Sequence, residues 1–249
     1  MTQCRNCDTP LDGPYCSACG QRNIDLERPI GTLLKELLRE TFDVDGRVAR
    51  TLVTLLWKPG VLTVEYVAGR RRLYSSPLRV YIVVSVLFFV VAAWIAGQGA
   101  LLEEGQTLGD AAEDQARLVG DLLPKLMFVL LPAFALFLKV AYRQRLYFDH
   151  LIHALHLHTT AYLVLALMLP LEESASTSVF ALVVQFTLLA YLLGAFVVSL
   201  RRVYATSWSV AGLRAFAVIF GYMIVVAALL EFAGHFVLPE SASIRILSD

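Results

Sequence analysis

Five long apolar runs constrain this chain more than any other feature of its sequence. The hydrocarbon core of a bilayer is about 30 Å thick, so a helix that spans it needs roughly 20 apolar residues. The chain has 249 residues, of which 57% are apolar and only 17% are charged. The runs predict an all-α membrane protein of about five transmembrane helices, within a bundle at residues 77–240 and with spans at 78–96, 122–142, 151–169, 179–200 and 213–237.

The positive charges predict the orientation of these spans. Loops on the cytoplasmic side of a membrane are rich in Lys and Arg. All but three of the 21 basic residues precede the first span, stand at its edge, or fall in the connections on the same side; the exceptions are Arg117, Lys125 and Arg245. No apolar stretch typical of a secretory signal precedes Ile30. We therefore expect a multi-pass protein of the inner membrane, with its N-terminus in the cytoplasm and residues 241–249 as an external tail.

The segment at residues 24–76 is predicted to form amphipathic helices. Apolar residues at helical spacing follow one another from Ile30 to Phe42, and a second pattern runs from Val44 to Trp57 and stops at a Pro-Gly pair. Two interpretations stay open. The helices either pack as a hairpin on the cytoplasmic face of the bundle or lie in the lipid interface. Arg70, Arg71 and Arg72 are candidates for contact with lipid headgroups, although such a run commonly serves only to set the topology.

All four cysteines of the chain stand in the stretch CRNCDTPLDGPYCSAC, as two C-x2-C pairs: Cys4, Cys7, Cys16 and Cys19. Four thiolates are a ligand set that structural zinc prefers, and two closely spaced pairs supply it. The stretch is too short for a hydrophobic core, so metal binding would provide most of its folding free energy. We therefore predict a zinc ribbon at residues 1–23 that holds one structural Zn²⁺ per chain.

Disulfides, a redox-active pair and an iron–sulfur cluster are the alternatives to zinc for these cysteines. Two disulfides are disfavoured because the predicted orientation places the cysteines in the reducing cytosol. A redox-active C-x2-C pair belongs at a helix start in a βαβ unit, which the surrounding sequence does not provide. An iron–sulfur cluster takes the same ligands, so it stays open. A shell closed by four thiolates leaves no position for catalysis.

Histidines crowd the start of the third apolar run, in the stretch DHLIHALHLH. Asp149, His153, His156 and Thr160 share one stripe of the predicted helix, His150 lies beside it, and His158 points the other way. Three interpretations stay open: a metal site, a site that moves protons or binds an anionic headgroup, and hydrogen bonds that join neighbouring helices. Glu231 and His235, one turn apart in the fifth run, form a secondary candidate pair near the other membrane face.

Three blocks of the sequence carry a resemblance: CRNCDTPLDGPYCSACGQ, WKPGVLTVEYVAGRRRLYSSPLRVYIVVSVLFF and YFDHLIHALHLHTTAYLV. Over residues 3–165 the chain resembles a bacterial family of zinc-ribbon integral membrane proteins that is catalogued as a domain of unknown function. The resemblance implies an N-terminal zinc ribbon, an inner-membrane location and no established activity. The family's acidic residue followed by spaced histidines matches Asp149, His150, His156 and His158, with Asp in place of the expected Glu.

No nucleotide-binding loop, serine-nucleophile motif or H-E-x-x-H metalloprotease motif is present in the sequence. The leading hypothesis is a protein without enzymatic activity, whose zinc ribbon docks a protein partner in envelope organisation, assembly or regulation. One alternative is a small transporter or lipid-handling protein that uses the histidine stripe, for which a homodimer is expected. A second alternative is a membrane metalloenzyme built on Asp149, His153 and His156. A net charge of zero gives no indication of a nucleic-acid partner.

Overall fold

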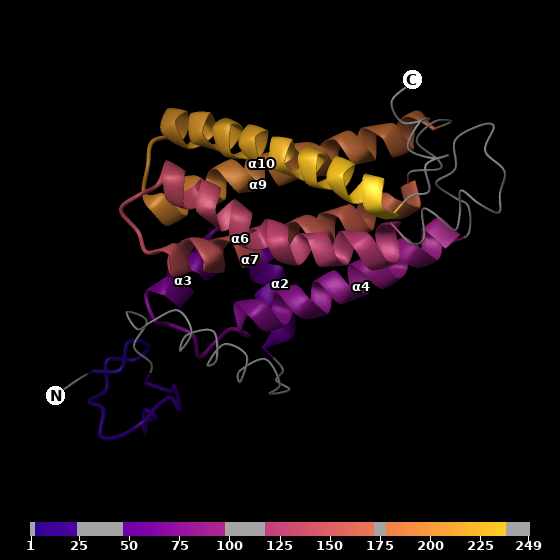
Figure 1. Ribbon diagram of the computed structural model, residues 1–249. Coiled ribbons are helices and arrows are strands. Elements are labelled where there is room, and N and C mark those ends of the chain that lie inside the picture. The colour runs from indigo at the N-terminus through magenta and orange to yellow at the C-terminus, as the bar shows by residue number, and fades with distance from the viewer. Residues whose placement is uncertain (1–2, 24–46, 98–117, 172–177, 238–249) are drawn as a thin grey trace, which may run out of the picture.

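The computed structural model describes residues 3–23, 47–97, 118–171 and 178–237 (Figure 1). The predicted helix at residues 30–42, most of the acidic connection after the first span, and the predicted tail at 241–249 lie outside the described residues. Two isolated antiparallel bridges stand in the N-terminal hairpins, and the regular elements of the described part are otherwise helices.

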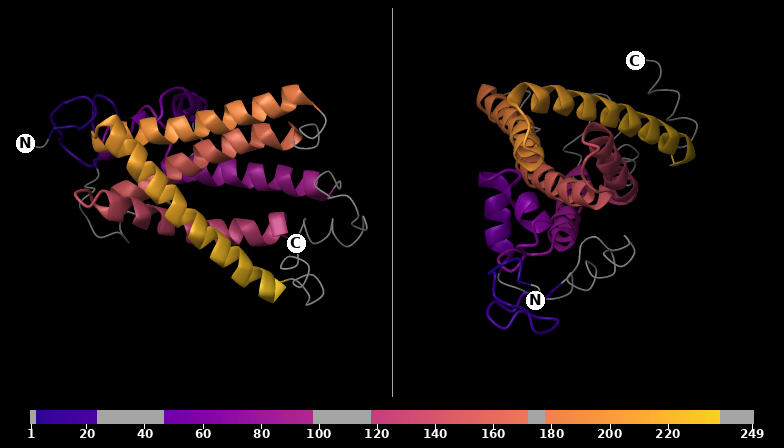
Figure 2. Two further views of the ribbon diagram at one scale, coloured as in Figure 1. Left: turned by 90° about the horizontal axis from the view of Figure 1, so that it is seen from above. Right: turned by 90° about the vertical axis from the view of Figure 1, so that its left-hand side faces the viewer.

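Among the described residues, five helices are long and apolar enough to cross a membrane, which confirms the predicted fold class. They are α4 (Pro77–Gly97), α6 (Leu123–Ala141), α7 (Tyr147–Met168), α9 (Val179–Tyr204) and α10 (Trp208–Val237). A π-helical turn, η1 (Leu118–Leu122), leads into α6, and a 3-10 turn, η2 (Leu169–Leu171), follows α7. Helices α4, α6, α7 and α9 run lengthwise through the molecule, and α10 crosses them obliquely (Figure 1 and the left-hand view of Figure 2).

Two spans begin earlier than their apolar runs. Helix α7 starts at Tyr147, four residues before the predicted boundary, and α10 starts at Trp208. A hydropathy pattern stops where polar residues begin, whereas a helix continues wherever its backbone hydrogen bonds can form. His153, His156 and His158 consequently occupy the interior of α7, and His150 lies at the end of its first turn.

Helix α7 is the centre of the bundle. It packs against α4, α6 and α9, and also against the short helices α2 (Val48–Trp57) and α3 (Val61–Val67). Ile152 and Leu155 of α7 are fully buried, together with Leu138 of α6 and Leu200 of α9. Toward the other end of α7, Tyr162 stacks on Phe88 of α4, with 5.1 Å between ring centroids.

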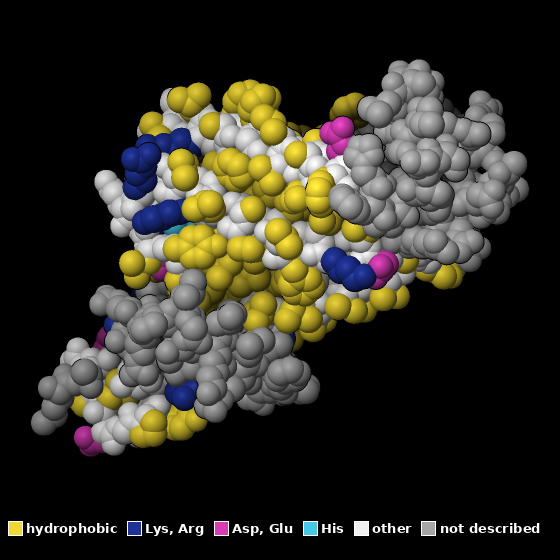
Figure 3. Space-filling view, in the orientation of Figure 1, with side chains coloured by type: hydrophobic (Ala, Val, Ile, Leu, Met, Phe, Trp, Pro, Cys, Tyr) yellow, Lys and Arg dark blue, Asp and Glu magenta, His cyan; other side chains and the backbone are white. Residues whose placement is uncertain are grey.

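Much of the outer surface of the bundle is apolar. Exposed Val, Leu and Phe side chains line α4, α6, α9 and α10, and Figure 3 shows these patches along one face of the bundle. In water such a surface would be costly, whereas lipid tails are as apolar as the side chains themselves. The fold therefore defines a multi-pass membrane protein.

Helices α2 and α3 form a tight hairpin at the end of the bundle that carries the N-terminal hairpins. The predicted Pro-Gly stop ends α2, and Gly60 turns the chain with a φ of +82°. A Cβ atom at Gly60 would come within 3.0 Å of the Ser199 Cα atom in α9. Only glycine allows both this backbone conformation and this close approach.

Candidate metal centre and buried histidine cluster

The four cysteines sit in two short hairpins of the same construction. In the first, the Cys4 amide donates to the Thr9 carbonyl (2.9 Å) and the Asp8 amide donates to the Cys4 carbonyl (2.8 Å). The second hairpin repeats both bonds twelve residues later, from Cys16 to Gln21 (2.9 Å) and from Gly20 to Cys16 (2.8 Å). The residue after the second cysteine is left-handed in each, with φ of 59° at Asp8 and 69° at Gly20. This conformation turns the two cysteines of each pair toward a common point.

The two hairpins bring their four sulfur atoms together. Cys4 Sγ lies 3.7 Å from Cys19 Sγ, and Cys7 Sγ lies 3.6 Å from Cys16 Sγ. All four sulfurs lie within 4.8 Å of one another, and none of the four cysteines is in a disulfide. Each short distance therefore joins one cysteine from each hairpin. The cluster is compatible with a site in which one metal ion links both hairpins.

The cluster is asymmetric in its exposure. Cys4 and Cys16 are buried, whereas Cys7 is exposed. Hydrogen bonds from the Thr9 hydroxyl and amide lower the pKa of the Cys7 thiol to about 6. Because the thiolate is the metal-binding form, this lowered pKa favours metal binding at Cys7.

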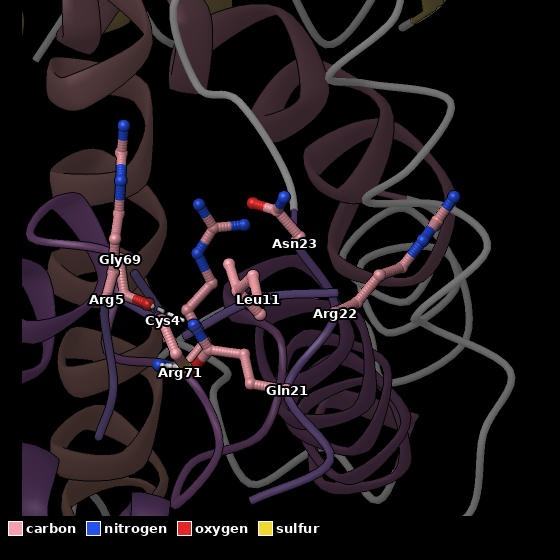
Figure 4. A pocket seen from close by; sticks show the side chains of 8 residues that line it. All are labelled: Cys4, Arg5, Leu11, Gln21, Arg22, Asn23, Gly69 and Arg71. Carbon is pink, nitrogen blue, oxygen red and sulfur yellow. Dashed lines mark hydrogen bonds between the residues drawn. The ribbon is translucent and has the colours of Figure 1, made fainter. Parts of the chain in front are cut away.

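Gln21 fixes the cysteine hairpins to the loop that precedes α4. Its side-chain amide donates to the Gly69 carbonyl (2.7 Å), and its side-chain oxygen accepts from the Arg71 amide (2.9 Å). A single side chain thus pairs with both a donor and an acceptor of the loop backbone. Figure 4 shows Gln21 together with Gly69 and Arg71 in the small pocket between the two segments.

Two further contacts tighten this junction. The Arg72 side chain donates from Nε to the Cys19 carbonyl (2.6 Å), so the loop contacts a metal-site residue directly. Gly69 is buried with a φ of +85°, and a Cβ atom there would lie 2.6 Å from Arg5 Cδ. Glycine therefore allows the first hairpin to pack on the loop.

The arginine run that was a candidate for lipid contact makes bonds within the protein. Arg70 forms a two-point salt bridge with Glu65 (2.6 and 2.7 Å) and lowers the pKa of that carboxyl group. The Arg71 guanidinium lies over the Tyr66 ring, 4.6 Å from its centroid, and Arg72 holds the cysteine hairpin. Contact of these residues with headgroups stays a prediction.

Two of the four histidines share one hydroxyl group. His150 Nδ1 lies 2.7 Å and His153 Nδ1 3.2 Å from the hydroxyl of Tyr204 in α9. The other ring nitrogen of His153 lies 2.6 Å from the Ser199 hydroxyl. His150 and His153 are fully buried, so these contacts replace water for groups that would be costly to leave unpaired.

The other two histidines bond to different helices. His156 Nδ1 lies 2.9 Å from the Thr63 hydroxyl of α3. His158 Nδ1 donates to the Ala154 carbonyl (2.9 Å), so its Nε2 accepts from the Tyr222 hydroxyl of α10 (3.1 Å). His158 points away from the stripe, as the helical spacing indicates. The four rings together tie α7 to α3, α9 and α10.

The structure does not assemble the proposed histidine metal site. Within the described ranges, the cysteine cluster is the one group of three or more His, Cys, Asp or Glu side chains close enough to hold an ion. His153 and His156 bond to hydroxyls on different helices, and the Thr160 hydroxyl donates to the His156 carbonyl (3.0 Å). Asp149 is half-buried in the first turn of α7. The metalloenzyme interpretation therefore lacks a converging ligand set.

The secondary candidate pair lies far along α10. Glu231 is exposed, and the side chain of His235 is outside the described residues, so their predicted interaction stays a prediction. The sequence analysis missed the hydroxyl partners of the histidines and the role of Gln21. Gln21 stands directly after the second cysteine pair and its glycine, and that adjacency was a usable signal for a residue at the junction.

The fold and the cysteine cluster define a multi-pass membrane protein with an N-terminal cluster compatible with a metal site. Over residues 45–89 the chain matches the family described as "Protein of unknown function (DUF3667)". This stretch covers α2, α3, the loop that Gln21 contacts, and the first half of α4. No curated protein and no solved structure matches the chain.

Replacing Gln21 by alanine is expected to loosen the junction between the hairpins and the loop. The change removes two hydrogen bonds, each with a net worth of about 0.5–1.5 kcal/mol. Trypsin cleaves after arginine, so cleavage at residues 70–72 should accelerate, as mapped by mass spectrometry. Ser17→Ala, on the exposed side of the same hairpin, is the control and should leave the rate unchanged. Equal cleavage rates in both variants would contradict the proposed role of Gln21.

Tyr204→Phe is expected to destabilise the bundle. It leaves nitrogens of two buried histidines without their shared partner, at a cost of about 1–3 kcal/mol. Thermal unfolding in detergent measures the effect as a lower Tm. The matched control is Tyr162→Phe, because the Tyr162 hydroxyl is buried in α7 and bonds to none of the four histidines. A Tm for Tyr204→Phe that is no lower than that of the control would show that the shared hydroxyl contributes nothing.

Proposed function

We propose that this chain is an integral membrane protein whose N-terminal hairpins bind one structural Zn²⁺ and serve as a cytoplasmic docking platform for a protein partner. The role that this suggests is envelope organisation, assembly or regulation, without catalysis at the metal. The observation that carries the proposal is the sulfur geometry. Four sulfurs at about 2.3 Å around a tetrahedral Zn²⁺ lie about 3.8 Å apart. The two short sulfur–sulfur distances, 3.7 and 3.6 Å, are close to that edge length.

The ligand set supports a structural role for the ion. Four thiolates complete the tetrahedron and leave no open position for water or substrate. Two of the four cysteines are buried although the hairpins have few other apolar side chains to bury. The metal then supplies the folding free energy that a stretch of about twenty residues lacks.

The placement of basic residues supports a cytoplasmic platform. The hairpins, the turn between α6 and α7 and the turn between α9 and α10 lie at the same end of the bundle (Figure 1). These two turns and the adjoining helix ends hold Lys139, Arg143, Arg145, Arg201, Arg202 and Arg214. Basic side chains gather at that end in Figure 3. By the positive-inside rule this end faces the cytoplasm, and five spans then bring α10 out on the opposite face.

One side of the ribbon is available to a partner. Gln21 and Arg72 occupy the side that faces the loop, whereas Tyr15 is 61% exposed and Asp12 is exposed. An exposed aromatic ring on a rigid hairpin is a common anchor in protein interfaces. The transporter and lipid-handling alternative stays a prediction, and hydrogen bonds within the bundle already involve each of the four histidines.

Metal analysis of detergent-purified protein tests the centre. We expect one zinc per chain, its loss in Cys4→Ser with Cys7→Ser, and no change in His153→Ala with His156→Ala. Protons compete with the metal for thiolates, so the zinc content should fall as the pH is lowered. Chelation should unfold the ribbon and open residues 70–72 to trypsin. Iron in place of zinc, or a second ion that the histidine variant loses, would contradict this proposal.

A pull-down from native membranes tests the platform. The Cys4→Ser, Cys7→Ser protein should lose partners that the wild-type protein retains, as quantified by mass spectrometry. Tyr15→Ala should lose the same partners while keeping its zinc, because its side chain is outside the metal shell. A cysteine variant that keeps every partner would refute the platform and leave the metal assignment standing.

A further inference from the structure

Helix α2 presents an apolar stripe that packs on nothing in the described structure. Its buried side, with Thr51 and Leu55, faces the protein. On the other side Val53 is 56% and Trp57 is 78% exposed, four residues apart and therefore neighbours on one face. Trp57 is the most exposed of the large apolar side chains in the described residues. An apolar stripe of this kind would be energetically costly next to water, so its surroundings require an explanation.

The position of α2 in the bundle indicates those surroundings. The Tyr191 hydroxyl donates to the Leu56 carbonyl (2.6 Å), and Arg202 donates to the Pro59 carbonyl. Tyr191 precedes the basic end of α9 by ten residues, about 15 Å of helix. The C-terminal end of α2 is thus fixed beside a membrane span, on the membrane side of the arginines that end it.

The direction of α2 differs from that of the spans. In Figure 1 and in the right-hand view of Figure 2, α2 runs across their long axis at the edge of the bundle. A helix that crosses the long axis of the spans lies close to parallel to the membrane plane.

The charges beside the stripe suit an anionic surface. Arg50 and Lys58 are exposed and stand before and after Val53 and Trp57 in the sequence. The Arg202 side chain is also nearby, since it donates to the carbonyl of Pro59, the residue that follows Lys58. Basic residues near an anionic membrane surface are attracted to its phosphate groups. Tryptophan favours the same depth, because its ring is apolar and its N–H is polar.

We infer that α2 is an interfacial anchor: Val53 and Trp57 enter the boundary between acyl chains and headgroups, and Lys58 contacts the phosphate groups of anionic phospholipids. The anchor holds the α2–α3 hairpin against the membrane at the end that carries the cysteine hairpins. It depends on neither the metal nor the docking partner. The opposite side of α2 stays bonded to the protein through Thr51, whose hydroxyl accepts from the Ser75 amide (2.9 Å).

The three tryptophans of the chain provide the test. Single-tryptophan proteins, with phenylalanine at the other two positions, are reconstituted into phosphatidylethanolamine and phosphatidylglycerol vesicles that contain brominated phosphatidylcholine. Trp208 is the reference for the same interface, since it begins α10 and is 57% exposed. Trp94, near the far end of α4 and 66% exposed, is the reference for the opposite face. A Trp57→Phe protein with no other change isolates the same signal if a single-tryptophan variant does not fold.

We expect lipid brominated near the ester linkage to quench Trp57 as strongly as Trp208, and lipid brominated near the chain end to quench it less. Lys58→Glu should reduce this quenching in phosphatidylglycerol vesicles and not in vesicles of phosphatidylcholine alone. Quenching of Trp57 by aqueous iodide and not by lipid would place α2 in water and overturn the inference. Quenching by neither would show that protein covers the stripe, and stronger quenching by the deeper bromine would place α2 in the core. Both results also overturn it.

Discussion

Within a bilayer, a polar group that finds no partner in the protein finds none at all, and α7 places four histidine rings under this constraint. Its backbone is satisfied by the helix itself, as in any span. Its side chains add four buried imidazoles within nine residues. Each ring has a hydroxyl partner on another helix, so the position and rotation of α3, α9 and α10 are fixed relative to α7. The apolar core around them does not require this arrangement, because leucine packing tolerates small rotations that a hydrogen bond does not.

The same demand explains why a short helical hairpin packs beside the spans. Thr63 of α3 is the described partner of His156, and Gly60 allows the hairpin to approach Ser199, which itself serves His153. Without the hairpin, one buried imidazole would lose its partner and the side of α7 that α3 covers would be open. Helices α2 and α3 therefore belong to the bundle structurally although they are too short to span it.

The sequence was most informative where a single physical requirement sets the pattern. Hydrocarbon thickness sets the length of the apolar runs, and this identified the five spans. Tetrahedral thiolate coordination needs four cysteines close together, and the two pairs indicated the cluster. Neither pattern could reveal Tyr204 or Gln21, because each acts through long-range contacts whose partners are 48 or more residues away. The arginine run shows the same limit, since charge composition predicts attraction to headgroups whereas Arg72 bonds to Cys19.

The loop between α3 and α4 connects these parts physically. Its Gly69 carbonyl accepts from the Gln21 side chain and its Arg71 amide donates to it. Its Arg72 carbonyl accepts from Arg47, and its Ser75 amide donates to Thr51 of α2. Only a few residues separate the carbonyl of Cys19 from the start of a span along this path. If the cysteine hairpins folded or unfolded, the structural change would therefore be transmitted to α4 through hydrogen bonds and not through a flexible linker. The segment that matches the family of unknown function contains this loop together with α2, α3 and the first half of α4.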